Sequence, residues 1–62
     1  MVNVLKERII ITKNLISFYE SNTPQTEYDR VFEKGYLSGL KSELKALEEM
    51  LTAAQMLQRL SA

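Results

Sequence analysis

The chain contains neither cysteine nor histidine among its 62 residues. Without cysteine there is no disulfide and no thiolate metal site, and without histidine the commonest metal ligand and the usual general base are missing. These absences predict a protein that is not an enzyme and that carries no metal or other cofactor. Small domains that lack disulfides and metals usually gain stability by oligomerisation instead, so we expect a homo-oligomer.

Net charge and long apolar runs are also lacking. Eight basic and eight acidic side chains cancel, so no overall field attracts nucleic acid or an anionic membrane. The longest unbroken apolar run, Ile9 to Ile11, is far shorter than the ~20 residues that span a bilayer. The first residues do not form the basic segment followed by an apolar segment that marks a signal peptide. We therefore expect no membrane partner and a cytoplasmic location.

Glycine and proline, which punctuate chains, occur only three times in total. The single proline lies in a polar stretch that predicts a loop over 21–26. The residues on either side have the periodicity and composition of amphipathic helices, which we expect over about 3–20 and about 27–60. The sequence thus predicts an all-α fold, in which residues 1–62 form a single helical-hairpin domain.

Capping residues can be assigned at both helix starts. Asn3 suits the N-cap of the first helix. The second helix has two candidate starts. Either Thr23 caps it with Pro24 at the first helical position, or Thr26 caps it with Asp29 three residues later.

The two expected helices differ in length, about 27 Å against about 50 Å. If the chain turns back near Pro24, residues whose numbers add to about 47 lie opposite each other, and everything beyond Leu44 has no neighbour in its own chain. Apolar residues continue there at spacings of three and four, as in a coiled coil. We therefore expect the hairpins to assemble into an oligomeric helical bundle, most simply a homodimeric four-helix bundle. The predicted interface is Leu44, Leu47, Met50, Leu51, Ala54 and Leu57.

Gly35 and Gly39 lie inside the second helix, where each glycine costs about 1 kcal/mol relative to alanine. The same antiparallel estimate places them opposite Thr12 and Arg8, two polar residues within the apolar side of the first helix. This arrangement predicts a close helix crossing formed by Gly35, Gly39, Arg8 and Thr12. Arg8 is then expected to pair with Glu43 or with a carboxylate of a second chain.

Five basic residues share one face of the second helix, opposite its apolar side. Such a stripe could follow a phosphate backbone, although a solvated face is the simpler interpretation. The predicted stripe is Arg30, Lys34, Lys41, Lys45 and Arg59.

The pattern Tyr28-Asp29-x-x-Phe32-x-x-Gly35-Tyr36-x-x-Gly39-Leu40-x-x-x-Leu44 resembles small uncharacterised helical-hairpin proteins of bacteriophages and their Gram-positive hosts. The resemblance covers about a quarter of the chain. It implies a phage-derived accessory protein that acts by binding, often to a host protein, and it assigns no role to any residue.

These observations favour a non-enzymatic protein–protein interaction module, a small homo-oligomeric accessory or regulatory protein. One alternative is a nucleic-acid-binding dimer that uses the basic stripe. A second alternative is an oligomer that sequesters a small ligand in pockets near Arg8 and Tyr36.

Overall fold

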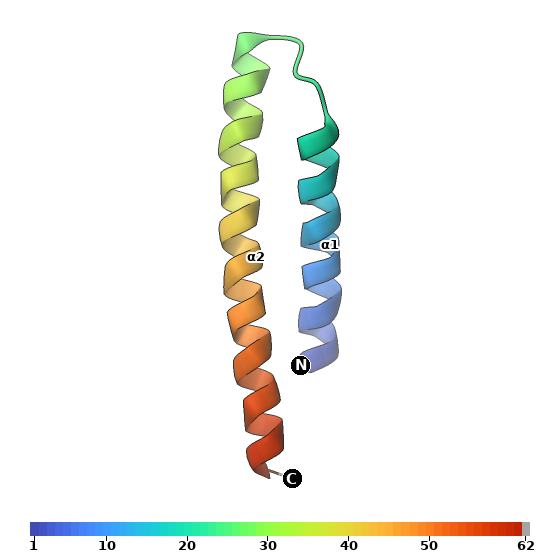
Figure 1. The fold of residues 1–62 in the computed structure, drawn as a ribbon, viewed down its shortest axis with the longest axis vertical. Helices are drawn as coiled ribbons and strands as arrows, with labels where there is room; N and C mark the ends of the chain where they lie inside the picture. Colours follow the sequence, from blue (N-terminus) through green and yellow to red (C-terminus); the bar gives the residue numbers. More distant parts are fainter. Residues whose placement is uncertain (62) are drawn as a thin grey trace.

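The computed structural model describes residues 1–61, which form two α-helices and the segment between them. Helix α1 spans Val2–Ser21 and helix α2 spans Glu27–Ser61. The helices lie side by side and antiparallel, so the chain is a hairpin (Figure 1). Its Cα atoms fill a rod of 53 × 14 × 12 Å. The predicted all-α hairpin is confirmed.

The helix ends follow local chemistry, with one correction. Each helix is within one residue of its expected bounds, but α1 begins at Val2, so Asn3 lies inside the helix and is not its N-cap. Met1 occupies the capping position without a side-chain hydrogen bond. At the start of α2, the amide of Asp29 donates to Oγ1 of Thr26 at 3.0 Å. Thr26 is therefore the cap, as the second of the two predicted starts required.

The register of the hairpin differs from the expected one. The rings of Tyr19 and Tyr36 lie 5.0 Å apart, and Nδ2 of Asn22 donates to Oε1 of Glu33 at 2.7 Å. Residue numbers of opposed positions thus add to about 55 rather than about 47. The cause is the segment 22–26, which climbs past the end of α1 before α2 begins (Figure 1). This climb slides α2 along α1 by roughly two helical turns.

A narrow apolar seam holds the two helices together. Ile9 and Ile16 of α1 and Leu40 and Leu47 of α2 are each less than a tenth exposed. Thr12, at 1% exposed, is the most deeply buried side chain among them. Above, below and between these residues the seam is completed by half-buried side chains: Val2, Leu5, Tyr19, Leu37, Leu44, Leu51 and Ala54.

This register overturns the expectation that α2 beyond Leu44 has no neighbour in its own chain. Leu47 is 8% exposed, and Leu44, Leu51 and Ala54 are half-buried. These four predicted oligomer contacts belong to the seam within the hairpin. Of the predicted interface residues, only Met50 and Leu57 stay exposed, at 53% and 66%.

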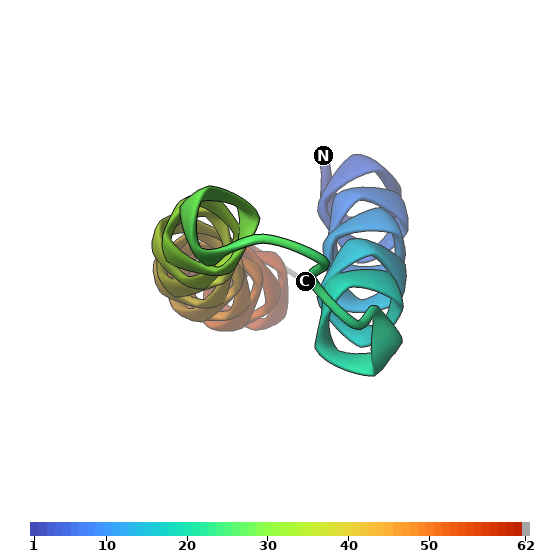
Figure 2. The same ribbon diagram turned by 90° about the horizontal axis from the view of Figure 1, so that it is seen from above.

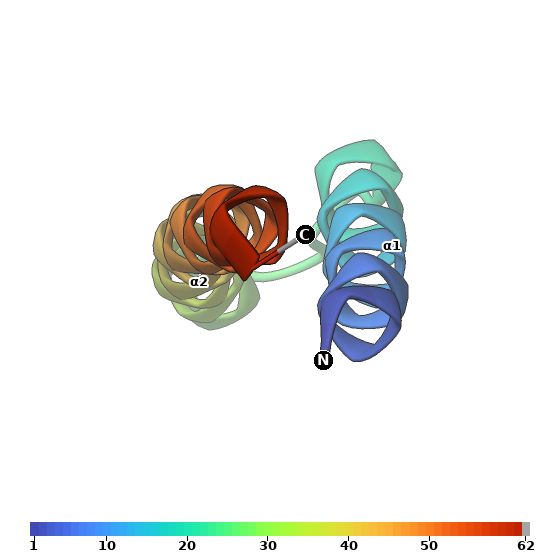
Figure 3. The same ribbon diagram turned by 90° about the horizontal axis from the view of Figure 1, so that it is seen from below.

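The hairpin is a single layer of two helices. Seen along the rod from either end, α1 and α2 stand next to each other, and no other part of residues 1–61 covers either broad side (Figures 2 and 3). Each helix therefore buries one strip of its surface, and the remainder of its circumference faces outward.

We predict that Leu47→Ala lowers the free energy of unfolding by about 2–5 kcal/mol, because it removes buried methyl groups from the seam. Leu60→Ala is the matched control, since Leu60 is 82% exposed. Urea unfolding followed by circular dichroism measures both changes. Equal effects of the two substitutions would contradict the placement of the seam.

Candidate interaction surface

Most of the exposed apolar side chains of the two helices gather on one broad side of the hairpin. On α1 they project about 120° from the buried strip, and on α2 about 100°, at 100° per residue. In an antiparallel pair both offsets have the same sense, so both groups face the same side. We call this side the apolar face; it consists of Val4, Ile11, Leu15 and Phe18 of α1 and Phe32, Tyr36, Gly39, Ala46, Met50, Ala53 and Leu57 of α2.

The end of the apolar face next to the loop is aromatic. The ring of Phe18 meets that of Tyr19 edge-on at 5.2 Å, and Tyr19 contacts Tyr36 across the hairpin at 5.0 Å. Tyr36 in turn stacks on Phe32, with ring centroids 6.3 Å apart. Phe18 and Phe32 remain 62% and 60% exposed. Four rings thus form a connected aromatic end, in which Phe18 and Phe32 are the most exposed.

The opposite end of the apolar face is an aliphatic groove. It has a volume of about 550 Å³ and lies between the start of α1 and the last turns of α2. Its walls are Met1, Val4, Leu5, Met50, Ala53, Ala54 and Leu57. None of these side chains carries a charge or a hydrogen-bonding group, so the groove suits an apolar occupant.

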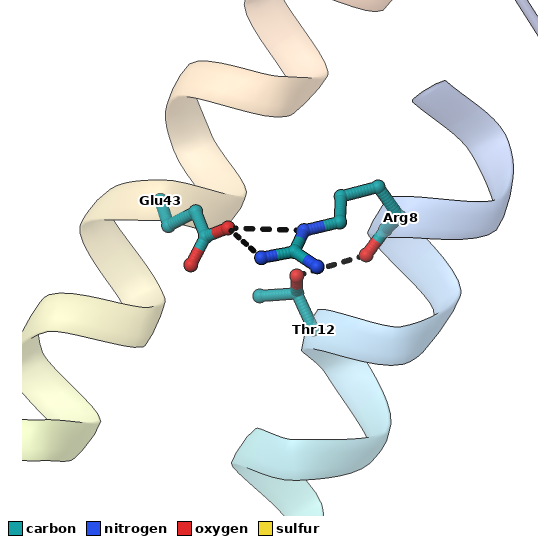
Figure 4. Close-up of polar contacts among 3 residues, drawn as sticks. All are labelled: Arg8, Thr12 and Glu43. Carbon is teal, nitrogen blue, oxygen red and sulfur yellow. Dashed lines mark hydrogen bonds and ion pairs between the residues drawn. The ribbon is translucent and has the colours of Figure 1, made fainter. Parts of the chain in front are cut away.

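An ion pair separates the aromatic end from the aliphatic groove. Both Nε and Nη2 of Arg8 donate to Oε1 of Glu43, at 3.3 and 3.1 Å (Figure 4). The side chains are 58% and 39% exposed, so the pair lies on the surface of the face rather than in the seam. Beneath it, the hydroxyl of Thr12 donates to the carbonyl of Arg8 at 2.8 Å. The expected Arg8–Glu43 pairing is confirmed.

Arg8 and Tyr36, the two residues of the expected ligand pocket, lie apart. Arg8 is level with Glu43, whereas Tyr36 is level with Tyr19, which is about three turns of helix away. The two side chains therefore do not converge on a shared ligand.

The predicted close crossing at Gly35 and Gly39 is wrong. A Cβ built on either glycine would have no heavy atom within 4 Å. Both residues are exposed and project away from the seam, while Thr12 lies within it and Arg8 pairs with Glu43. The physical reason is the shift in register, which brings residues other than Arg8 and Thr12 level with the glycines. Within a single chain, the space beside both glycines is therefore open, and neither glycine contacts α1.

The basic stripe lies on the opposite broad side from the apolar face. Lys34, Lys41 and Lys45 line a shallow hollow together with Leu37 and two serines. Two of its charges already form ion pairs. Nζ of Lys41 lies 3.2 Å from Oε2 of Glu20, and Nη1 of Arg30 lies 3.9 Å from Oε2 of Glu27. Arg59 is in the last turn of α2, which extends past the N-terminal end of α1 (Figure 1).

A metal site and a membrane-spanning helix are two further features that a chain of this kind could carry. Residues 1–61 bring no three acidic side chains close enough to ligate a metal ion. Neither α1 nor α2 combines the length and the apolar character that a bilayer-spanning helix requires.

Most of the apolar face escaped the sequence interpretation, although a signal for it exists. Besides the seam residues, α2 carries a second series that alternates spacings of four and three over its whole length. That series is Phe32, Tyr36, Gly39, Glu43, Ala46, Met50, Ala53, Leu57 and Leu60. Its small residues made it inconspicuous beside the leucines of the seam.

Comparisons of the chain with family models, with curated proteins and with solved structures found no match.

For the ion pair we predict a coupling of only about 0.2–1 kcal/mol, because both charges are partly exposed and screened by solvent. A double-mutant cycle with Arg8→Ala and Glu43→Ala, followed by urea unfolding, measures this value. A coupling several times larger would contradict the exposed position of the pair.

Proposed function

We propose that the chain is a non-enzymatic protein–protein interaction module, a small accessory or regulatory protein that binds through its apolar face. One observation carries this proposal: most of the exposed apolar side chains of both helices lie on a single side, from the aromatic end to the aliphatic groove, interrupted there by the Arg8–Glu43 ion pair. Large contiguous apolar patches on small proteins mark binding surfaces. Single exposed apolar residues do not, and Ile10, Val31 and Met56 are of that ordinary kind.

The energetics of the isolated hairpin support the proposal. Burying one large aliphatic or aromatic side chain contributes about 1.5–3 kcal/mol. The seam buries four apolar side chains and half-buries seven more, whereas six large apolar side chains of the apolar face stay 49–67% exposed: Val4, Ile11, Phe18, Phe32, Met50 and Leu57. Domains of this size have a net stability of only a few kcal/mol, so covering these six side chains would add substantially to it.

The partner is best matched by another helical surface. The apolar face is a rod-shaped strip along two parallel axes rather than a deep cavity, and its second series has the spacing of a coiled coil. A helix laid along the strip would place its own apolar side chains between those of α1 and α2.

The alternatives receive less support. The basic stripe is exposed, but ion pairs to Glu20 and Glu27 already offset two of its charges. No aromatic side chain of the four-ring cluster lies on that side, so stacking of bases beside the stripe has no platform. The ligand-sequestering alternative depended on a pocket shared by Arg8 and Tyr36, which lie on different parts of the face.

For the biological setting, we keep the proposal that the resemblance to small phage proteins implies. A phage-derived accessory protein that acts in the cytoplasm on a host protein would use a surface of this kind.

To test the proposal, a photo-reactive amino acid is placed at Met50 or at Met56, one chain position per variant. The two methionines lie on the same helix and are 53% and 56% exposed, but only Met50 belongs to the apolar face. After irradiation in the source cell, we expect covalent protein adducts at position 50 and few at position 56. Electrophoresis with mass spectrometry detects them.

Adducts that form equally at both positions, or at neither, would rule out the apolar face as the binding surface. Adducts at position 56 alone would move the binding surface to the other side of α2.

A further inference from the structure

We infer that the partner of the apolar face is a second copy of this chain, placed antiparallel about a twofold axis that crosses α2 between Leu44 and Lys45. This inference rests on the proposed function, because it names the occupant of the same face. It goes further in fixing the orientation of the second copy and the residues that meet.

The hairpin on its own exposes more surface than a folded monomer of its mass usually does. The chain exposes 5090 Å², whereas a folded monomer of its mass typically exposes about 4,100 Å². The excess of about 1,000 Å² is close to the ~800 Å² that each partner buries in a stable, specific interface. One further hairpin laid on the apolar face would therefore bring the exposed surface to the usual value.

The two ends of the apolar face are complementary in shape, because one projects rings and the other is hollowed. The aromatic end projects Phe18 and Phe32, and the opposite end is a groove of about 550 Å³ with purely apolar walls. A twofold axis across the middle of the rod carries each end of one copy onto the other end of its partner. The rings of each chain then lie over the aliphatic groove of the other chain.

The order of large and small residues in the second series of α2 also suits antiparallel pairing of two copies. In the proposed register, residues whose numbers add to 89 face each other across the axis. Met50 then meets Gly39 of the second copy, and Tyr36 meets its Ala53, so in these pairs a large side chain faces a small one. At the ends, Phe32 meets Leu57 of the second copy, and near the axis Glu43 meets its Ala46.

This register gives Gly39 a physical reason. The glycine lowers helix propensity, yet nothing within its own chain needs the space where a Cβ would be. In the paired arrangement that space receives the side chain of Met50 from the second copy. A knob from one helix entering a hole on the facing helix is the packing expected for coiled coils.

The two helices also centre their residues of the apolar face at one level. On α2 these residues run from Phe32 to Leu57 and are centred between Leu44 and Lys45, and on α1 they run from Val4 to Phe18 and are centred on Ile11. These two centres are opposed in the hairpin, because their numbers add to about 55, as do those of Tyr19 and Tyr36. A single twofold axis can therefore bisect both sets at once.

Charge complementarity agrees with the same axis. The Arg8–Glu43 pair lies close to the level of the axis, so the ion pairs of the two copies become neighbours. Each arginine of one copy then faces a region that contains the carboxylate of the other, and no uncompensated charge enters the interface.

Cross-linking with engineered cysteines tests orientation and register together. Because the native chain has no cysteine, each substitution introduces one unique thiol. Gly39→Cys and Met50→Cys chains are mixed and oxidised mildly. We expect the mixed disulfide, because positions 39 and 50 of different copies are opposed. Neither variant alone should cross-link efficiently. Two copies of position 39 lie about 16 Å apart along the length of the helices, beyond the ~7 Å between Cα atoms that a disulfide can bridge.

Light scattering of the unmodified chain and of two aspartate variants supplies the second measurement. We expect the wild-type chain to have about twice its 7.2 kDa mass. Met50→Asp should weaken the dimer at least about 100-fold, because a twofold contact contains the substitution twice. Met56→Asp, at equal exposure on the other side, should leave the dimer intact.

The contrary results are distinct. Disulfides between two copies of position 39, or between two copies of position 50, would show a parallel pair and overturn the proposal. A dimeric mass without the mixed disulfide would overturn the register. A helical wild-type monomer would overturn the second copy as occupant, whereas the proposed function would still stand if photo-adducts formed in the cell at Met50 and not at Met56.

Discussion

Two helices can touch only along one line, and this geometric constraint governs the rest of the structure. Each helix buries a strip of side chains on that line, and no third element of residues 1–61 covers what remains. The seam of Ile9, Ile16, Leu40 and Leu47 satisfies the constraint within the chain. The apolar face is its consequence, because apolar residues that flank the seam on one side have no neighbour in the hairpin. We propose that a second molecule supplies that neighbour.

The helices could be predicted from the sequence because local interactions determine them, and Thr26 was one of two candidate caps for α2. Apolar periodicity, turn chemistry and a capping hydroxyl all act within a few residues. The register could not be predicted in the same way, since it depends on the path of the segment 22–26. That segment climbs before α2 begins, and the side chain of Asn22 ties it to Glu33. A small difference in the loop thereby changed every opposed pair of residues.

The misplaced register explains the errors about the binding surface. With the wrong alignment, Leu47 and Leu51 seemed to lack neighbours, and Gly39 seemed to face Arg8. In the structure the leucines belong to the seam, and the glycines are open to solvent. The Arg8–Glu43 pair was predicted correctly because long side chains bridge several residues of misalignment. What the sequence does contain, beside the conspicuous leucines, is the second series of alternating large and small residues.

The central claim is that the apolar face is covered by a second copy, and the concentration dependence of thermal unfolding tests it most directly. Because association stabilises the folded chain by mass action, the Tm of a homodimer rises with protein concentration. We predict a clear rise in Tm when the concentration of the wild-type chain is raised a hundredfold. A Tm that stays constant over that range would contradict the account, since it would mean that the hairpin folds and remains alone.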